Sequence, residues 1–477
     1  MDSKLWWILV ILILIPKQGE SKRMILEQEE CNPEDLKGLT SFKAGIHLDS
    51  SNRLEAWVGS NCCKWVGVYC SNTTGRVAEL RLPGFLETNE TFSQTSMVGW
   101  LSPSITLLTS LEVLDLGWLI SLSGTIPSSI GFDLPSLRIL KLSLNNLTGP
   151  IPESIGKLSR LEEIFLDGNS LSGQIPSSIG RLSQLIFLNI SNNLIEGPLP
   201  SEMSSLHNLQ SLDLSFTRLN ISSIPKWLGE MPSLRRVFLA GVGIQGNFPE
   251  LFQTTPSPLL ELDLSFNNLI GIIPEWLGNF TRLYKLNLSR NSFESKIPST
   301  FTSLNDLGVL DLHSNMLTGL IDVVFLIEGS FPGGTLTYVD LSDNLFSGEI
   351  LEIGTGPQTT TVFLNLSNNY LQGHFPDSIG RLVSLRSLDL SYNKLVFGLP
   401  EYLANVSSLE KLKLQRNRFT GEIPNGYLKL KALRELDLSD NGLVGKIPDG
   451  APLSDFPRSS FSGNIGLCEK PLSPCKF

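Results

Sequence analysis

A repeat of about 24 residues constrains the fold of this chain more than any other feature. The stretch from Leu161 to Gln184 reads LEEIFLDGNSLSGQIPSSIGRLSQ, and a fresh copy begins at once with LIFLNISNNLIEGPLP. Within the unit, Ile164 and Leu166 alternate with polar residues, as in a short half-buried strand, and a Gly-Gln-Ile-Pro turn follows. One such unit cannot bury its own apolar face, so the copies must stack around a continuous core.

An asparagine marks the same place in most copies, and we call this place the Asn slot. Thr217 and Val242 fill it in two copies. An asparagine there can bond the backbone of its own and the next coil, and leaving those groups unpaired would cost roughly 1–3 kcal/mol each. We therefore assign the slot to the scaffold. Its asparagines are Asn145, Asn169, Asn193, Asn267, Asn291, Asn315, Asn344, Asn369, Asn393, Asn417 and Asn441.

The repeat resembles that of plant-type extracellular leucine-rich-repeat proteins, whose pattern is LxxLxLxxNxLxGxIPxxIGxL. The match runs from Val77 to about Pro457. The resemblance implies an α/β-type leucine-rich-repeat solenoid, a right-handed superhelix with a concave parallel β-sheet and disulfide-closed caps. The plant-specific GxIP turn begins at Gly124, Gly149, Gly173, Gly271, Gly421 and Gly445.

The ends of the chain differ from the repeats. An apolar run from Leu5 to Ile15 is too short for a bilayer span but typical of a secretory signal peptide. No second long apolar run follows, so we expect a secreted protein of the apoplast or cell wall, or one held at the outer face of the plasma membrane by a partner. The expected divisions are a signal peptide at 1–21, an N-terminal cysteine-rich cap at 22–76, about 15 repeats at 77–456 and a C-terminal cap at 457–477.

All six cysteines lie outside the repeats, which behind a signal peptide indicates disulfides formed in an oxidising compartment. A metal site is the weaker interpretation, because the sequence has no CxxC and no paired histidines nearby. Leu36, Leu39, Phe42 and Ile46 recur at helical spacing and predict a short helix over the first coil. By resemblance to the plant caps, the disulfides are assigned as Cys31–Cys62, Cys63–Cys70 and Cys468–Cys475.

Composition and motifs argue against several classes of function. The formal net charge of −10 excludes nucleic acid as a bulk electrostatic partner. The four histidines are scattered, and GxSxG and HExxH are absent. A GxGxxG at Gly241, Gly243 and Gly246 lies in repeat register, and Phe248-Pro249 follows where a dinucleotide fold needs a helix. We expect no enzyme, no metal and no cofactor.

Two polar series follow the repeat. Aspartates recur in the LDLS segment, and we predict that they face water as a structural ladder and not as a calcium site. They are Asp213, Asp263, Asp311, Asp340, Asp389 and Asp437. Candidate glycosylation sites of the form N-x-S/T are Asn72, Asn89, Asn146, Asn189, Asn220, Asn279, Asn287, Asn365 and Asn405. At Asn189, Asn287 and Asn365 a glycan would obstruct a ligand on the concave sheet.

The predicted ligand-binding site is an aromatic patch on exposed strand positions of successive copies. Its area is about 300 Å², and scattered, partly covered rings are the alternative. Segments 85–100 and 318–337, which lose the period, are further candidates. The basic set Lys411, Lys413, Arg416 and Arg418 is interpreted as a solvated face. The patch consists of Phe165, Phe187, Phe216, Phe238 and Phe266, with Arg290 as a charged edge.

The resemblance implies a secreted plant recognition protein. Our main hypothesis is that it binds a protein or peptide ligand on its concave face, in defence or developmental signalling. Its partner would be an extracellular protein or peptide, such as a membrane receptor kinase or a microbial hydrolase. One alternative is an inhibitor of a microbial cell-wall hydrolase, similar to the polygalacturonase-inhibiting proteins, although that family has shorter solenoids and more cysteines. The other is a structural cell-wall glycoprotein.

Overall fold

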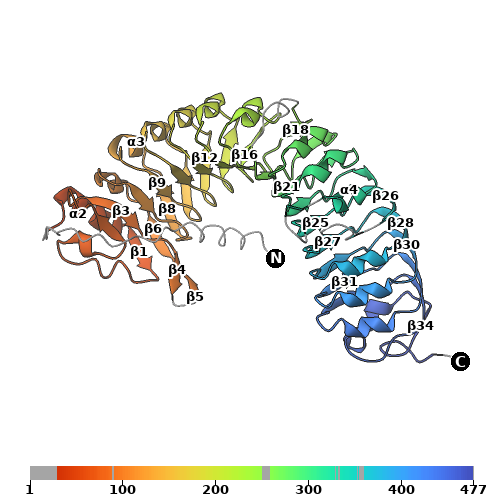
Figure 1. The fold of residues 1–477 in the computed structure, drawn as a ribbon. Coiled ribbons are helices and arrows are strands. Elements are labelled where there is room, and N and C mark those ends of the chain that lie inside the picture. The colour runs from red at the N-terminus through yellow and green to blue at the C-terminus, as the bar shows by residue number, and fades with distance from the viewer. Residues whose placement is uncertain are drawn as a thin grey trace.

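The computed structural model describes residues 30–88, 91–249, 258–327, 329–330, 334–351, 353 and 359–475. The predicted signal peptide at 1–21 lies outside the described residues. The repeats wind into an arch, and its N-terminal and C-terminal limbs lie on either side of an open concave space (Figure 1). This is the solenoid that the repeat predicts.

A 16-stranded sheet lines the concave side. Its first strand is antiparallel to the second, and all the others pair in parallel. In a strand such as Glu163–Phe165 the middle residue enters the core while its neighbours face the concave side. The strands, in order, are β2 (Val68–Cys70), β3 (Val77–Arg81), β7 (Val113–Asp115), β9 (Ile139–Lys141), β11 (Glu163–Phe165), β13 (Phe187–Asn189), β15 (Ser211–Asp213), β17 (Arg236–Phe238), β19 (Glu261–Asp263), β21 (Lys285–Asn287), β23 (Val309–Asp311), β25 (Tyr338–Asp340), β27 (Phe363–Asn365), β29 (Ser387–Asp389), β31 (Lys411–Lys413) and β33 (Glu435–Asp437).

A second layer of strands, the lateral layer, runs beside the concave sheet in three pieces. The first piece is β1 (Ile46–Asp49), β6 (Met97–Trp100), β8 (Leu122–Thr125), β10 (Asn146–Gly149), β12 (Ser170–Gly173), β14 (Leu194–Gly197) and β16 (Arg218–Leu219). The second is β18 (Gln245–Gly246), β20 (Asn268–Gly271) and β22 (Ser292–Phe293). The third is β24 (Thr318–Gly319), β26 (Leu345–Glu349), β28 (Tyr370–His374), β30 (Lys394–Phe397), β32 (Arg418–Gly421), β34 (Gly442–Lys446) and β35 (Gly466–Cys468).

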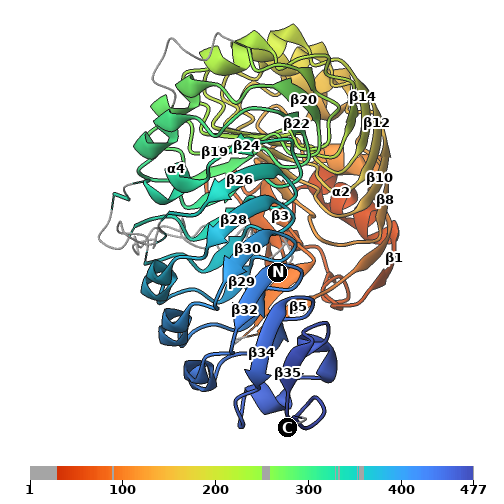
Figure 2. The ribbon, with the colours of Figure 1, turned by 90° about the vertical axis from the view of Figure 1, so that its right-hand side faces the viewer.

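Short helices cover the convex side, and Figure 2 shows them stacked along one side of the C-terminal limb. Most are five-residue 3-10 helices, and the proline of the GxIP turn precedes them, as Pro176 precedes Ser177–Arg181. The α-helices are α2 (Pro33–Ala44), α3 (Ile130–Asp133) and α4 (Asp322–Phe325). The 3-10 helices are Cys62–Lys64, Pro103–Leu107, Glu153–Lys157, Ser177–Arg181, Ser201–Ser205, Lys226–Glu230, Glu275–Asn279, Ser299–Ser303, Asp377–Arg381, Glu401–Asn405, Asn425–Lys429, Leu453–Asp455 and Arg458–Phe461.

The Asn slot joins adjacent coils. The amide nitrogen of Asn193 donates to carbonyls of its own coil and to Leu166 O of the preceding one, at 3.0 Å. Its Oδ1 accepts from the backbone N–H of Leu171, also in the preceding coil. We expected the slot side chain to bond the next coil, but it bonds the preceding coil, so that part of the prediction is wrong. In the described structure the Thr217 side chain donates one hydrogen bond, to Leu214 O of its own coil. Val242 has no side-chain polar group.

The aspartate series forms a ladder, but it does not uniformly face water. Asp213, Asp263 and Asp340 are buried, which contradicts the prediction. Burial raises the pKa of Asp213 to about 6. Each of the three accepts a hydrogen bond from the backbone N–H two residues later, as Asp263 does from Ser265. Half of the series is therefore packed into the concave sheet as part of the scaffold.

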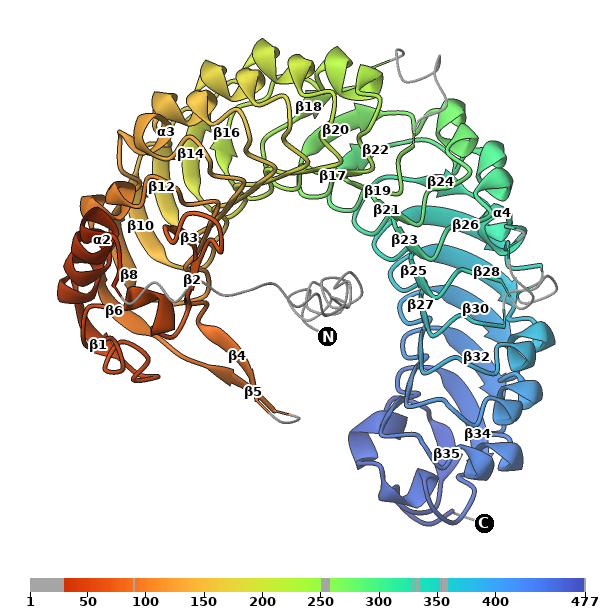
Figure 3. The same ribbon diagram turned by 60° about the vertical axis from the view of Figure 1, so that its left-hand side comes forward.

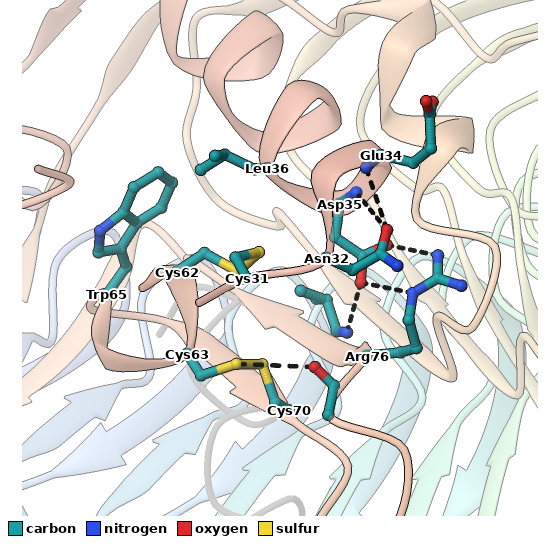
Figure 4. The surroundings of a disulfide bond; sticks show 12 residues. Cys31, Asn32, Glu34, Asp35, Leu36, Cys62, Cys63, Trp65, Cys70 and Arg76 are labelled. Atoms are coloured by element: carbon teal, nitrogen blue, oxygen red, sulfur yellow. Dashed lines mark hydrogen bonds and ion pairs between the residues drawn. A yellow bond between two sulfur atoms is a disulfide. The ribbon is translucent and has the colours of Figure 1, made fainter. Parts of the chain in front are cut away.

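The N-terminal cap closes the first coil (Figure 4). Helix α2 begins after Asn32, whose side chain accepts from the N–H of Glu34, and its Asp35 is fully buried. The Asp35 carboxylate accepts two hydrogen bonds from the Arg76 guanidinium, at 2.6 and 2.8 Å, and a third from the N–H of Val77. Removing one partner of a buried pair leaves an uncompensated charge, which costs about 3–5 kcal/mol. This pair therefore fixes the cap to the repeats.

Disulfides close both caps with the pairings that the resemblance implies. In the N-terminal cap the bonds are Cys31–Cys62 and Cys63–Cys70. The sulfurs of Cys62, Cys63 and Cys70 lie within 4.8 Å of one another, but all three are in disulfides, so none is a thiolate for a metal. At the other end Cys468 bonds Cys475.

Candidate functional site

One residue in each repeat has a left-handed backbone at the edge of the concave sheet. It directly precedes the Asn slot, and φ there lies between 52° and 64° from Leu144 to Asp440. We call it the rim position. Successive rim positions are stacked, because the N–H of Phe216 donates to Ala240 O, just before rim residue Gly241. The N–H of Gly241 then donates to Ser265 O, just before Phe266.

The residues at several rim positions are unusual for this backbone. Glycine, asparagine and aspartate tolerate a left-handed conformation, whereas other residues lose about 1–2 kcal/mol. Besides the half-buried Leu144, five bulky and exposed residues nevertheless occupy it, and such strain is commonly kept at functional sites. They are Phe216, Phe266, Arg290, Tyr392 and Arg416, and all five are exposed.

Phe216, Phe266 and Arg290 form the first rim cluster. The two rings meet edge to face with centroids 5.7 Å apart, although a whole repeat separates them. They can meet because the rim residue between them is Gly241, where a Cβ would lie 2.8 Å from Cδ1 of Phe216. Each ring is 49% exposed. The glycine thus lets two aromatic side chains from alternate repeats form one exposed apolar surface.

Arg290 extends this surface with a positive charge. Its Cζ lies 4.8 Å from the ring centroid of Phe266, and its Nε donates to Nε2 of His313 at 3.2 Å. Nδ1 of that histidine contacts Asp311 Oδ1 at 2.6 Å, and this hydrogen bond raises the pKa of His313. No carboxylate among the described residues lies within 4 Å of Arg290. While the imidazole is neutral, its Nε2 therefore holds the guanidinium in place, and Arg290 keeps its charge for a ligand.

Tyr392, Arg416 and Asp440 form a second rim cluster in the C-terminal limb. Arg416 lies over the ring of Tyr392, with Cζ 5.0 Å from the centroid. Its Nε also pairs with Asp440 Oδ2 at 3.3 Å. The geometry repeats that of the first cluster, but a carboxylate neutralises the charge.

The predicted aromatic patch is only partly correct. Phe216 and Phe266 lie in left-handed turns and not on strands. Phe165 and Phe187 are half-buried on the concave sheet and stack on each other at 6.3 Å. Phe238 is 7% exposed, so the prediction that it is exposed is wrong. The five rings therefore do not form one continuous patch.

Phe187 pairs with Ser211 at the start of β15, whereas Phe216 lies beyond the end of that strand. Phe165, however, is the last residue of β11, so the first pair runs diagonally across the concave sheet, and only the second pair lies wholly beyond the strand ends. Strand alternation places the first pair correctly but misses the second, because the chain has already turned at the rim. Aligning the repeats on the Asn slot would have identified the rim position, and with it Tyr392 and Arg416.

The other candidate segments have distinct structures. Residues 85–100 include a hairpin, β4 (Phe85–Thr88) and β5 (Thr91–Gln94), which projects toward the open side of the arch (Figure 3). Phe85 and Phe92 stack on it at 5.2 Å. Segment 318–337 contains β24 and α4, and part of it lies outside the described residues. Lys411 and Lys413 both pair with Glu435, which supports the interpretation of that basic set as a solvated face.

The candidate glycosylation sites fall into two groups. Asn72, Asn146, Asn220, Asn279 and Asn405 are exposed. The strand sites Asn189, Asn287 and Asn365 are half-buried, and the last two donate their amide N–H to neighbouring aspartates. Asn89 lies outside the described residues.

The fold and the caps define a leucine-rich-repeat solenoid, and family models agree. A leucine-rich repeat N-terminal domain matches residues 32–71, and a leucine-rich repeat region matches 91–250. Single leucine-rich repeats match six stretches between 258 and 452. None of the described helices has the length and apolarity to cross a bilayer.

Known proteins place the chain among plant relatives. Receptor-like protein 35 of Arabidopsis thaliana is 34% identical over 190 residues, which cover 38% of this chain and 19% of that protein. The chain spans between 14% and 35% of the lengths of curated receptor-like relatives that it matches. It belongs to the leucine-rich-repeat proteins and is homologous to plant receptor-like proteins.

Two solved structures share the fold at useful identity. The LRR ectodomain of the plant membrane receptor kinase GASSHO1/SCHENGEN3 from Arabidopsis thaliana, in complex with CASPARIAN STRIP INTEGRITY FACTOR 2, has a TM-score of 0.68 and 34% identity. It covers 80% of this chain and 48% of that one. The plant peptide hormone receptor RGFR1 in complex with RGF2 has a TM-score of 0.61, 29% identity and coverage of 78% and 66%.

Proposed function

We propose that this chain recognises a protein or peptide outside the plant cell, in defence or developmental signalling, and that the first rim cluster anchors the ligand. The main support for this proposal is that two exposed aromatic rings and an arginine occupy strained rim positions in neighbouring repeats. The fold requires the left-handed backbone there but does not require large side chains. Retaining them at a cost of about 1–2 kcal/mol each favours a role in binding.

The cluster indicates the chemistry of the ligand. Phe216 and Phe266 offer an apolar surface, which would take an aliphatic or aromatic side chain. Arg290 lies on the next repeat, about 5 Å further along the arch, and would take a carboxylate. A ligand with an apolar residue beside an acidic group fits both. Anchors of this kind, aromatic residues and arginine together, dominate the energy of many interfaces.

The solved relatives support a recognition role, since their titles describe ectodomains in complex with CASPARIAN STRIP INTEGRITY FACTOR 2 and with RGF2. The disulfide-closed caps and the exposed glycosylation sites fit an extracellular location. The apoplast, with a receptor kinase as a further partner, is our specific proposal. A microbial hydrolase bound at the same cluster would identify the chain instead as an inhibitor.

The test compares three baits in apoplastic fluid. The wild-type chain, Phe266→Ala and the matched control Tyr392→Ala are immobilised at equal density, and captured proteins and peptides are identified by mass spectrometry. We expect at least one species that the wild type and the control retain and that Phe266→Ala loses. Equal capture by all three baits would contradict a binding role for the first rim cluster.

A further inference from the structure

A hollow of about 480 Å³ lies on the lateral layer, over strands β6, β8 and β10, and none of the rim-cluster residues lines it. His47, Trp100, Ile120, Ser123, Asn145 and Asn146 are among its lining residues. Asn146 also begins the sequence Asn-Leu-Thr, so the hollow contains a candidate glycan attachment point. From this coincidence we propose that the hollow holds the first two sugars of an N-linked glycan on Asn146.

Strand register brings the attachment point and the indole onto one face. In adjacent parallel strands Trp100 pairs with Ser123, and Ser123 pairs with Asn146. Residues in register point the same way, and two strand spacings separate Trp100 from Asn146 by about 10 Å. The side chain between them is small, and its Oγ is turned toward the neighbouring strand β6, where it donates to Gly99 O at 2.6 Å. A sugar ring attached to Asn146 would therefore lie over Ser123 with its apolar face toward the indole.

The walls of the hollow suit a sugar, which has both apolar C–H faces and hydroxyl groups. Trp100 and Ile120 are 45% and 53% exposed. The ring of His47 packs edge-on against the indole, with ring centroids 4.9 Å apart. Ile120 has φ of 66°, a conformation that a branched side chain adopts only under strain, so its exposed position has an energetic cost. Sugar packed on these residues would cover apolar surface that otherwise contacts water.

At the floor of the hollow, the side-chain oxygen of the slot asparagine differs in its hydrogen bonding from those of later repeats. In later repeats Oδ1 of the slot asparagine accepts an N–H from the preceding coil, as Asn169 does from Leu147. Within the described part of the chain, Oδ1 of Asn145 is buried and has no hydrogen-bond partner. The residue is 8% exposed and lines the hollow. An amide or hydroxyl group of the first sugar is a donor of the kind that this acceptor lacks.

The experiment measures how well the protein protects its own glycans. The full chain is produced in a secretory host that adds high-mannose glycans, and an endoglycosidase that cuts between the first two sugars is applied under native conditions. Glycopeptide mass spectrometry follows each site. Asn405, exposed at the end of the convex helix Glu401–Asn405, is the matched control. We expect trimming at Asn146 to be at least about tenfold slower than at Asn405.

Trp100→Ala should raise the trimming rate at Asn146 to within about twofold of that at Asn405. If that variant does not fold, Ile120→Ala tests the opposite wall in the same way. Hydrogen exchange gives a second readout, since Asn146→Gln should increase exchange across residues 97–123 and Asn405→Gln should not. An unmodified Asn146, equal trimming of the two sites in the wild type, or binding of free chitobiose equally by the wild type and Asn146→Gln would overturn the proposal.

Discussion

The two rim clusters share a backbone and a stacking geometry but differ in charge. In both, an arginine lies about 5 Å from an aromatic centroid and donates through Nε to the next repeat. The acceptor is His313 in the first cluster and Asp440 in the second. Arg290 thus keeps a net charge, whereas Arg416 is already paired. The repeat supplies the position, and one residue in the following copy decides whether the charge is available to a ligand.

The largest effect is expected from removing a ring of the first cluster. Phe266→Ala deletes half of the apolar surface and the face on which Arg290 lies, so affinity for the captured ligand should fall by about 2 kcal/mol or more. Calorimetric titration measures it. Tyr392→Ala removes the equivalent ring of the second cluster and should leave affinity unchanged. Equal losses in the two variants would remove the distinction between the clusters.

The next effect concerns the scaffold beneath each cluster. Asn267 accepts two N–H groups, from Val242 and Ile244, whereas Asn393 accepts one, from Leu371. Replacement by alanine should lower the free energy of unfolding by about 1–3 kcal/mol, with Asn267→Ala the more costly. Urea titration measures it, and Phe216→Ala serves as a control that should change stability little. A control that unfolds as early as Asn267→Ala would mean that the rings are packing residues.

A smaller effect separates the two arginines. Arg290→Ala should weaken binding of an acidic ligand by about 1 kcal/mol and reduce the dependence of affinity on salt. Arg416→Ala should do neither, because its partner Asp440 already compensates the charge. Asp440→Asn sharpens the comparison, since it should give the second cluster a measurable affinity for the same ligand. Affinities measured over a range of salt concentrations decide between these outcomes.

The smallest effect is a pH dependence at His313. Its hydrogen bond to Asp311 raises its pKa above the ordinary value of 6.5, so the folded chain binds this proton more tightly than the unfolded chain. The resulting stabilisation is complete below pH 6.5 and is lost as the pH rises through the folded-state pKa. The free energy of unfolding of the wild type should therefore fall relative to that of His313→Gln above pH 6.5. A difference that stays constant with pH would show that the histidine does not titrate there.

The sequence predicts the repeating part of the fold almost completely, because each copy contains its own strand, Asn slot and turn. The period places Leu188 in the core and Phe187 on the concave face. It fails at the rim, where alternation continues past the last strand residue and assigns Phe266 to a strand that has ended. The burial of Asp213 is also missed, because it depends on packing across neighbouring coils.

Features that occur once in the chain cannot be predicted from the pattern of the repeat. The hollow beside Asn146 depends on β1 pairing antiparallel with β6, which joins Ile46 to Gly99. Among the described strands, no other pair repeats that contact. The role of Gly241 is similarly hidden, since its missing side chain matters only after Phe216 and Phe266 are known to lie on either side of it.

The lateral layer is interrupted between β16 and β18, in the same coils where Thr217 and Val242 replace the slot asparagine. The concave sheet continues without a break. A second interruption lies between β22 and β24. In mechanical terms the arch has one continuous layer beside a layer with two breaks, and such a body bends most easily at the breaks. Phe216 lies on one side of the first break and Phe266 on the other. A ligand side chain wedged against both rings would therefore set the angle between the two limbs.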